Sequence, residues 1–511
     1  MGRLAVALVV SLWVIPISTM VNRIVPEPYM DEIFHIPQAQ QFCKGNFRSW
    51  DPMITTPPGL YYLSLIPLIS GLWRTNDSLS LSKICSPAVL RSTNGVLAIL
   101  CSILLYDLII HLRPSIGDRD ATLYTLVLTL YPVHWFFTFL YYTDVASLAV
   151  VLAMYLACLK RNYWLSAVLG GLAISIRQTN VIWMLFIAAI GGIDYLVREY
   201  HKKYDDDLLI AKSTGLEGEN HRPVSANLKK RKMRKMGSFA SATDISTAKA
   251  NVHSSKSSSM LSTGVLKEIQ EIFSALWCLK WNFLVLFSPY LLIFGAFVSF
   301  VILNGSIVLG AKEAHTVSPH FAQIFYFGLA SAAAMGPIHF NLCQAAALFK
   351  SLRMNKLLSF FVVCISLAAG SISVHFFSIE HPYLLADNRH YPFYIWRKVI
   401  KAHWLMKYLL VPFYVYSWLS IYHILGKFQR KTWVLLFLFA CGAVLIPAPL
   451  IEFRYYTIPY FFIILHSHTG GYKHWFVIAI LYVTVNVFTM AMFLYRPFHW
   501  DHEPGTQRFI W

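Results

Sequence analysis

Residues 29–40 read YMDEIFHIPQAQ and follow a first apolar segment that ends near Met20. Adjacent carboxylates repel, so burial or a third charge can push their pKa values apart, leaving one as a base and the other as an acid or hydrogen-bond acceptor. Asp31 and Glu32 are therefore the first candidates for catalysis. Pro37 suits the first residue of a short helix that carries Gln38, which predicts that 31–35 form the turn leading into it. The alternative is a solvated pair of loop acids.

The composition outside this stretch excludes a soluble globular protein. Of 511 residues, 57% are hydrophobic and 13% are charged, with a mean hydropathy of +0.52. Such a chain is predicted to be an all-α polytopic membrane protein. Its net charge of +18 would suggest nucleic acid in a soluble protein, but in a membrane protein Lys and Arg mark cytosolic loops. We therefore expect membrane lipid, and no nucleic acid, among the partners.

Hydropathy and charge together predict about thirteen transmembrane helices. The first, 4–20, is interpreted as a retained span because no clear cleavage site follows it, so 21–85 form the first loop outside the cytosol. Five later loops agree with a positive cytosolic side. The expected spans are 4–20, 86–112, 121–138, 141–159, 163–177, 180–197, 283–303, 322–349, 357–378, 405–425, 432–450, 456–468 and 474–495.

Three regions divide the chain. Residues 1–198 form an N-terminal membrane module with the loop 21–85, and residues 265–511 form a C-terminal module with non-cytosolic loops near 304–320 and 378–404. Between them, 199–264 are Ser-rich and basic, which predicts a disordered cytosolic linker. The basic run at 229–235 could also bind anionic lipid or act as a targeting signal.

Cysteines and glycosylation sequons add little to this topology. Only Cys43 and Cys85 fall outside the bilayer on one side, so a disulfide between them is possible, although no framework of paired cysteines supports it. Sequons at Asn76 and Asn304 fall in loops expected outside the cytosol, Asn76 only if the apolar stretch 60–73 does not cross.

Ionisable residues gather on the non-cytosolic side, at 141–144, 177–180, 380–391 and 452–456. Charged groups at or within spans are costly and are usually functional or mutually paired. Their gathering on one face indicates a site there. For a single pair, such as Asp144 with Arg177, a structural ion pair is an equal alternative.

This set of residues suits an anionic substrate carried by a lipid. Arg389, His390 and Arg454 could balance a phosphate through charge-assisted hydrogen bonds. Asp31 could take the proton of an attacking hydroxyl. Glu32 and His35 have the spacing of a carboxylate metal site, but a second such pair is missing, so no metal is predicted. The sequence has no phosphate-binding glycine loop for a soluble nucleotide. A competing class is a transporter or channel with Asp31, Arg177 and Glu452 along its path.

Four blocks of sequence closely resemble the alpha-1,2-glucosyltransferase family of asparagine-linked glycosylation. The blocks are YMDEIFHIPQAQ at 29–40, WDP at 50–52, TTPPGLY at 55–61 and ADNRHY at 386–391, and the resemblance runs to RFIW at 508–511, excluding 199–264. It implies a multi-pass protein of the endoplasmic reticulum membrane with a GT-C fold and a lumen-facing active site in the first luminal loop. The implied reaction is transfer of the last glucose from dolichyl phosphate glucose to the diglucosylated lipid-linked oligosaccharide.

The resemblance also suggests roles for residues. Donor and product have opposite anomeric configuration, so one general base and an inverting displacement are implied, without a metal or other cofactor. Asp31 is the expected base and Glu32 the alternative. Looser analogy gives the donor phosphate to His381, Arg389, His390 and Arg454. The remaining expected substrate contacts are His35, Gln38, Trp50, Asp144, Arg177 and Asp387.

Overall fold

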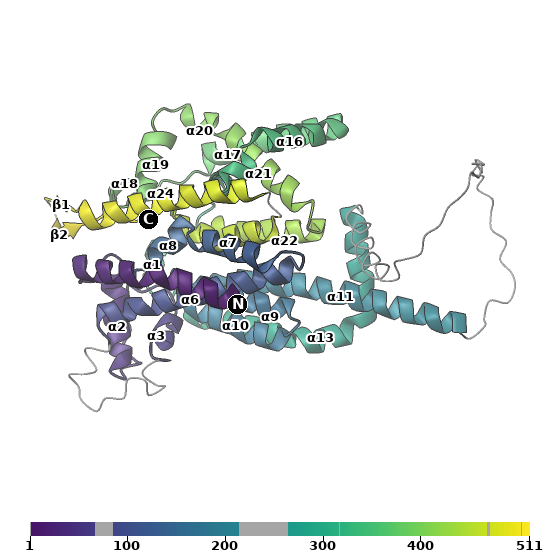
Figure 1. The fold of residues 1–511 in the computed structure, drawn as a ribbon, viewed down its shortest axis with the longest axis horizontal. Coiled ribbons are helices and arrows are strands. Elements are labelled where there is room, and N and C mark those ends of the chain that lie inside the picture. Colours follow the sequence, from purple (N-terminus) through teal and green to yellow (C-terminus); the bar gives the residue numbers. More distant parts are fainter. Residues whose placement is uncertain (1, 67–84, 214–263, 316, 468–470, 502) are drawn as a thin grey trace, which may run out of the picture.

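A computed structural model of the protein describes residues 2–66, 85–213, 264–315, 317–467, 471–501 and 503–511 (Figure 1). Helices account for nearly all regular structure in these ranges. The two strands described there, β1 (Phe498–Trp500) and β2 (Glu503–Gln507), pair antiparallel as a hairpin near the C-terminus. The predicted all-α, polytopic membrane fold is confirmed.

The first part of the chain runs from α1 to α11. Pro87 and Pro132 occupy the first positions of their helices, where a missing backbone N–H costs nothing. The helices are α1 (Gly2–Ile24), α2 (Glu32–Cys43), α3 (Gly59–Ser64), α6 (Pro87–Leu112), α7 (Asp118–Thr129), α8 (Pro132–Phe137), α9 (Thr143–Leu159), α10 (Tyr163–Ile176) and α11 (Asn180–Ser213).

The second part begins with the long helix α13 (Val265–Asn304), which ends at Gly305 in the left-handed conformation that favours glycine. The elements that follow are η1 (Lys312–His315), α14 (Ala322–Ala334), α15 (Gly336–His339), α16 (Leu342–Met354), α17 (Lys356–Phe376), α18 (Pro382–Ala386), α19 (Tyr391–Ile395), the π-helix η2 (Trp396–Ile400), α20 (Met406–Leu409), α21 (Val411–Leu425), α22 (Lys431–Leu445), η3 (Phe453–Tyr456), α23 (Thr457–His466) and α24 (Tyr472–Tyr495).

Seven helical stretches among the described residues are long and apolar enough to cross a membrane, and four further apolar helices are shorter. The count of about thirteen is therefore not reproduced. Two of the expected spans are broken. Residues 121–138 divide at Pro132 into α7 and α8, and 322–349 divide at Gly336-Pro337 into α14, α15 and α16. Proline ends a helix because it lacks the N–H and crowds the preceding turn, which average hydropathy does not register.

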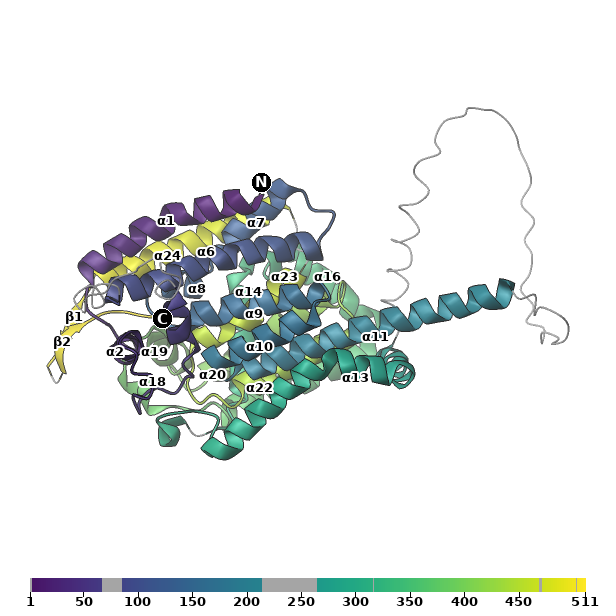
Figure 2. The same ribbon diagram turned by 90° about the horizontal axis from the view of Figure 1, so that it is seen from below.

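The helices pack as one bundle in which late segments return to early ones. In the N-terminal part, α6 packs against α1, α7 and α9. In the C-terminal part, α21 packs against α14 and α17. The two parts meet where α13 packs on α10 and α11, where α22 packs on α11 and where α24 packs on α7 and α8 (Figure 2).

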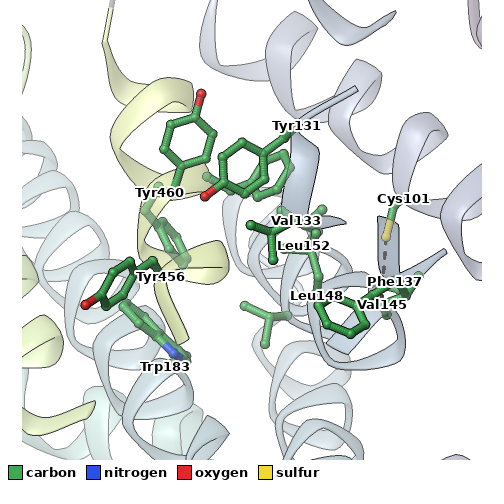
Figure 3. Close-up of a cluster of buried hydrophobic side chains, with 14 of the residues drawn as sticks. Cys101, Tyr131, Val133, Phe137, Val145, Leu148, Leu152, Trp183, Tyr456 and Tyr460 are labelled. Atoms are coloured by element: carbon green, nitrogen blue, oxygen red, sulfur yellow. Dashed lines mark hydrogen bonds between the residues drawn. The ribbon is translucent and has the colours of Figure 1, made fainter. Parts of the chain in front are cut away.

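An aromatic core lies where α8, α9, α11 and α23 meet (Figure 3). Tyr131 stacks on Tyr460 with ring centroids 4.2 Å apart, and Trp183 stacks on Phe462 at 5.5 Å. Phe137 belongs to this core, and the Arg454 guanidinium lies 5.4 Å from its ring centroid. The core therefore supports the loop that carries Arg454.

The two ends of the bundle differ. The start of α2, helices α3 and α18 and the β-hairpin gather at one end, whereas α16 and the last turns of α11 lie at the other (Figure 1). α11 continues to Ser213, so the predicted disordered linker does not begin at 199. The rest of that linker, 214–263, lies outside the described residues, as does Asn76.

The loop predicted to be the first luminal one is fastened at several points. Cys43, the last residue of α2, forms a disulfide with Cys85 just before α6. Loop 52–55 pairs with the segment after α13 through backbone bonds from Leu309 to Thr55 and from Ala311 to Pro52, at 3.1 and 3.0 Å. The possible disulfide is thus present, and the two predicted luminal loops meet.

Candidate functional site

A cavity of about 330 Å³ opens at the end of the bundle that holds α2 and α18. It collects side chains from segments far apart in the sequence, as the gathering of polar residues predicted. Its lining includes Asp31, His35, Thr55, Thr56, Tyr142, Arg177, Tyr383, Asp387, His390, Glu452, Arg454 and Tyr455.

Asp31 is the residue that precedes α2. The expected start of this helix at Pro37 is wrong, because α2 already begins at Glu32 and Pro37 lies inside it, so 32–35 are helical and do not form a turn before the helix. Its side chain is 42% exposed, and its Oδ2 accepts a hydrogen bond of 2.8 Å from Arg454 Nη1. The backbone N–H of Asp31 donates to the Tyr142 hydroxyl at 3.1 Å. The preceding residue, Met30, has φ of +56°, which is unfavourable for a side chain larger than glycine and is typical of functional sites.

The charge state of Asp31 follows from its surroundings. Burial alone would raise the pKa of this carboxyl, but the charge and hydrogen bond of Arg454 outweigh burial and hold the pKa below its usual range. Asp31 is therefore ionised at neutral pH and can accept a proton. In His35, burial outweighs the attraction of Asp31 and lowers the pKa, so the ring is neutral there.

A chain of ion pairs extends from Asp31 across the cavity wall. Arg454 also pairs with Glu452 at 2.7 Å and approaches Asp144 Oδ2 at 3.9 Å. Asp144 in turn accepts a 2.7 Å bond from Arg177, so the structural ion pair is present. Arg177 lines the cavity, whereas Asp144 is not among the residues that line it. Only Nη1 of Arg177 bonds Asp144, so the other N–H groups of this guanidinium do not take part in the ion pair.

Glu32 lies outside the cavity, in the interior. Its side chain is fully buried and pairs with Arg91 of α6 through Nε at 2.9 Å and Nη2 at 2.6 Å. Its carboxylate also accepts the backbone N–H groups of Tyr29 and Tyr141, at 3.1 and 2.6 Å. Both carboxylate oxygens of Glu32 are therefore occupied by hydrogen bonds that stabilise the fold. This argues against Glu32 as the alternative base and against its pairing with His35 on a metal.

Three predicted substrate contacts belong to α2 and the loop after it. His35 lines the cavity and shares a hydrogen bond of 2.6 Å with the Tyr61 hydroxyl. Gln38 is buried and holds the loop at 49–51, bonding Ser49 O at 2.7 Å and the Asp51 N–H at 2.9 Å. Trp50 packs with its ring 6.0 Å from that of Tyr61. Gln38 and Trp50 support the wall and do not line the cavity.

In the 386–391 segment, too, some of the predicted site residues line the cavity and others do not. Asp387 and His390 line the cavity, but Arg389 points to the hairpin. Its guanidinium forks onto Asp387 at 2.9 and 2.8 Å, donates to Gln507 at 2.9 Å and lies 4.6 Å from the Trp500 ring centroid. His381 caps α18 by accepting the Tyr383 N–H at 3.3 Å. Arg389 and His381 are therefore poorly placed to bind the donor phosphate.

Several lining residues were not singled out from the sequence. Tyr142, Thr55 and Thr56 were noted only as parts of longer polar stretches, and Tyr383 and Tyr455 resemble ordinary interface aromatics. The motif TTPPG could have pointed to Thr55 and Thr56. Its glycine, Gly59, has no room for a Cβ because the Ser175 backbone lies against it, so glycine lets α3 pack closely on α10.

Comparison with known proteins shows the family of the chain. The model of the DIE2/ALG10 family matches residues 25–465. A protein of Arabidopsis thaliana is 54% identical over the full length of both chains, and proteins of Mus musculus and Homo sapiens are 34% identical over 96% of this chain and 94% of theirs. All three are named Dol-P-Glc:Glc(2)Man(9)GlcNAc(2)-PP-Dol alpha-1,2-glucosyltransferase. No solved structure matches. The chain belongs to the DIE2/ALG10 family.

Proposed function

We propose that this protein transfers glucose from dolichyl phosphate glucose, in alpha-1,2 linkage, to the lipid-linked oligosaccharide that already carries two glucoses. The names of full-length relatives at 34% to 54% identity state this reaction. Both substrates are then membrane lipids with polar heads. The enzyme works in the endoplasmic reticulum membrane with the cavity facing the lumen, an orientation supported by the basic loops expected at the opposite end of the bundle.

The observation that carries the proposal is the half-exposed carboxylate of Asp31, held by Arg454 at 2.8 Å in the wall of the cavity. In a single displacement, the 2-hydroxyl oxygen of the acceptor glucose attacks C1 of the donor glucose. Its proton passes to Asp31, the bond from C1 to the phosphate oxygen breaks, and dolichyl phosphate leaves. Arg454 fixes the carboxylate so that its remaining lone pairs face the acceptor.

Recognition of the leaving phosphate is assigned to Arg177 and His390 in place of Arg389. Both line the cavity, and Arg177 commits a single nitrogen to Asp144. A guanidinium with further N–H groups suits a phosphodiester, whose negative charge grows as the bond to C1 breaks. Asp387 stays ionised because the hydrogen bonds of Arg389 outweigh its burial and lower its pKa. Its carboxylate lies 3.7 Å from Nε2 of His390.

An apolar cavity of about 490 Å³ lies between α10 and α13, next to the polar one. Pro57 and Pro58 line it directly after Thr55 and Thr56 of the polar cavity, and Gln178 lines it directly after Arg177. A polar chamber beside an apolar one at the membrane suits lipid-linked substrates. It does not suit the transporter alternative, which the comparisons do not support.

The experiment is transfer by purified protein in liposomes. Labelled dolichyl phosphate glucose and the diglucosylated lipid-linked acceptor should give one further glucose, released by an alpha-1,2-specific glucosidase. The monoglucosylated acceptor is the matched control and should remain unmodified. Loss of donor without labelled acceptor, or transfer to the monoglucosylated control alone, would refute the assignment.

A further inference from the structure

The 508–511 segment, Arg-Phe-Ile-Trp, is not part of the reaction described above, yet it touches three of the segments that supply ionisable groups to the cavity. Tyr29, two residues before Asp31, donates its hydroxyl to Arg508 O and accepts the Arg508 N–H, both at 2.7 Å. The side chain of Arg508 in turn caps the end of α24 by donating to Phe493 O and Leu494 O. The segment is thus held firmly beside the turn that carries the base.

The same segment adds a backbone ladder to the 389–391 stretch. Ile510 N–H donates to Arg389 O at 2.9 Å, and Tyr391 N–H donates to Ile510 O at 3.1 Å. Ile510 is 1% exposed, so this ladder is shielded from water. It fixes the backbone on both sides of His390.

The imidazole of His390 is fixed as well. Its Nδ1 lies 3.1 Å from Trp511 O, and a carbonyl oxygen can only accept, so Nδ1 carries the hydrogen. The other ring nitrogen, Nε2, points away from Trp511, with Asp387 Oδ2 3.7 Å from it, and it can donate to an anion when it carries a hydrogen as well. The Trp511 ring keeps its carbonyl in place by packing against Tyr391 and Phe453, at 5.1 and 5.7 Å between centroids. Phe453 directly precedes Arg454.

We propose that Trp511 is a positioning residue for phosphate recognition: its ring anchors the 508–511 segment, and its main-chain oxygen holds Nδ1 of His390 and so sets the direction in which Nε2 points. This rests on the proposed function for the identity of the donor. It also gives Arg389 a role, because Arg389 holds Gln507, the residue just before the segment, at 2.9 Å.

The test compares Trp511→Ala, Trp511→Phe and the matched control Phe509→Ala. Phe509 lies in the same segment, but its ring packs on Tyr394 and Phe498 of the outer surface. We expect Trp511→Ala to raise KM for dolichyl phosphate glucose about tenfold, the cost of roughly one charged hydrogen bond, with acceptor KM unchanged. Trp511→Phe keeps an aromatic anchor and should restore most of the affinity, and Phe509→Ala should behave as wild type.

A double-mutant cycle separates positioning from general damage. In a His390→Gln background, Trp511→Ala should change donor KM less than twofold, because the group it positions is gone. Equal effects of Trp511→Ala with and without His390, or no effect on donor KM at all, would overturn the proposal.

A second readout is the thermal stabilisation of the purified protein by dolichyl phosphate, which does not require turnover. Trp511→Ala should abolish most of that stabilisation, and an undiminished shift would overturn the proposal. If wild-type protein transfers no glucose, the proposed function fails by itself, while this binding comparison still decides the role of Trp511.

Discussion

The turn at 29–31 with the first residue of α2, Glu32, and the loop at 386–391 both carry neighbouring charged residues next to the cavity, but they hold them differently. In the turn, Asp31 is 42% exposed while Glu32 is fully buried against Arg91. In the loop, Asp387 and His390 line the cavity while Arg389 pairs outward, with both partners of its ion pair 17% exposed. The first region depends on a sealed interior pair, and the second on a pair that water still reaches. Disturbing the turn should therefore cost more than disturbing the loop.

The largest expected effect on rate is that of Asp31→Asn. The amide is nearly isosteric but cannot accept the acceptor's proton, and loss of a general base typically costs about 10²–10⁴ in rate. Stabilisation by dolichyl phosphate should survive. Asp387→Asn is the control from the second region and should lose far less, because Asp387 already shares its charge with Arg389. A ranking in the opposite order, in correctly inserted protein, would move the base out of the turn.

The next effect is on stability. Arg91→Gln leaves Glu32 buried without its partner, and breaking one side of such a pair costs about 3–5 kcal/mol. We expect thermal unfolding in detergent to occur at clearly lower temperature than in wild type. Arg389→Gln disturbs a pair in contact with water, so its unfolding temperature should fall much less. Equal losses in the two variants would show that burial does not distinguish the two regions.

A smaller effect is expected on donor recognition, where substitutions of Arg177 and Arg389 should differ in donor KM. Arg177→Lys keeps the charge but loses the planar fork, which should raise donor KM by about ten- to a hundredfold. Arg389→Lys should change donor KM only slightly, because Arg389 lies outside the cavity. Initial rates over a range of dolichyl phosphate glucose concentrations, at saturating acceptor, measure both. A large donor effect for Arg389→Lys alone would return the phosphate to the 386–391 loop.

The smallest expected effect is that of deleting 214–260. Both flanks of this region are held by the folded part, since His201 of α11 pairs with Glu271 of α13 at 3.2 Å and Glu268 caps the start of α22. The deletion should leave transfer and insertion near normal. Complete loss of transfer by correctly inserted protein would give the linker a role that its composition does not suggest.

Sequence patterns predicted the class of fold well, and its segmentation less well. Apolar runs report burial in lipid, so the helices around 87–112 or 472–495 were evident. Breaks at Pro132 and Gly336 lie inside apolar runs, where tertiary packing decides whether the helix continues.

In the site as well, local sequence predicts some features, whereas others depend on partners that are distant in the sequence. Asp31 stood out because it is polar, next to another acid and close to a span. The role of Glu32 could not be predicted, since its partner Arg91 is 59 positions away inside an apolar helix. The charge of Arg389 predicts a contact to the donor phosphate, but the hairpin residue that binds its guanidinium lies more than a hundred residues later. Local sequence identifies charged candidates, and only the fold decides which of them face the substrate.

The pH dependence of transfer tests most directly whether Asp31 is the base and Arg454 its orienting partner. Activity requires the ionised carboxylate, so the rate should fall as pH decreases through its pKa. Arg454 holds that pKa low against burial. Arg454→Gln removes the largest contribution that opposes burial, so the pKa of Asp31 should rise and the acid limb of kcat should move to higher pH, whereas Arg389→Gln should leave it in place. An acid limb unchanged in correctly inserted Arg454→Gln would contradict the assignment of Asp31 as the base.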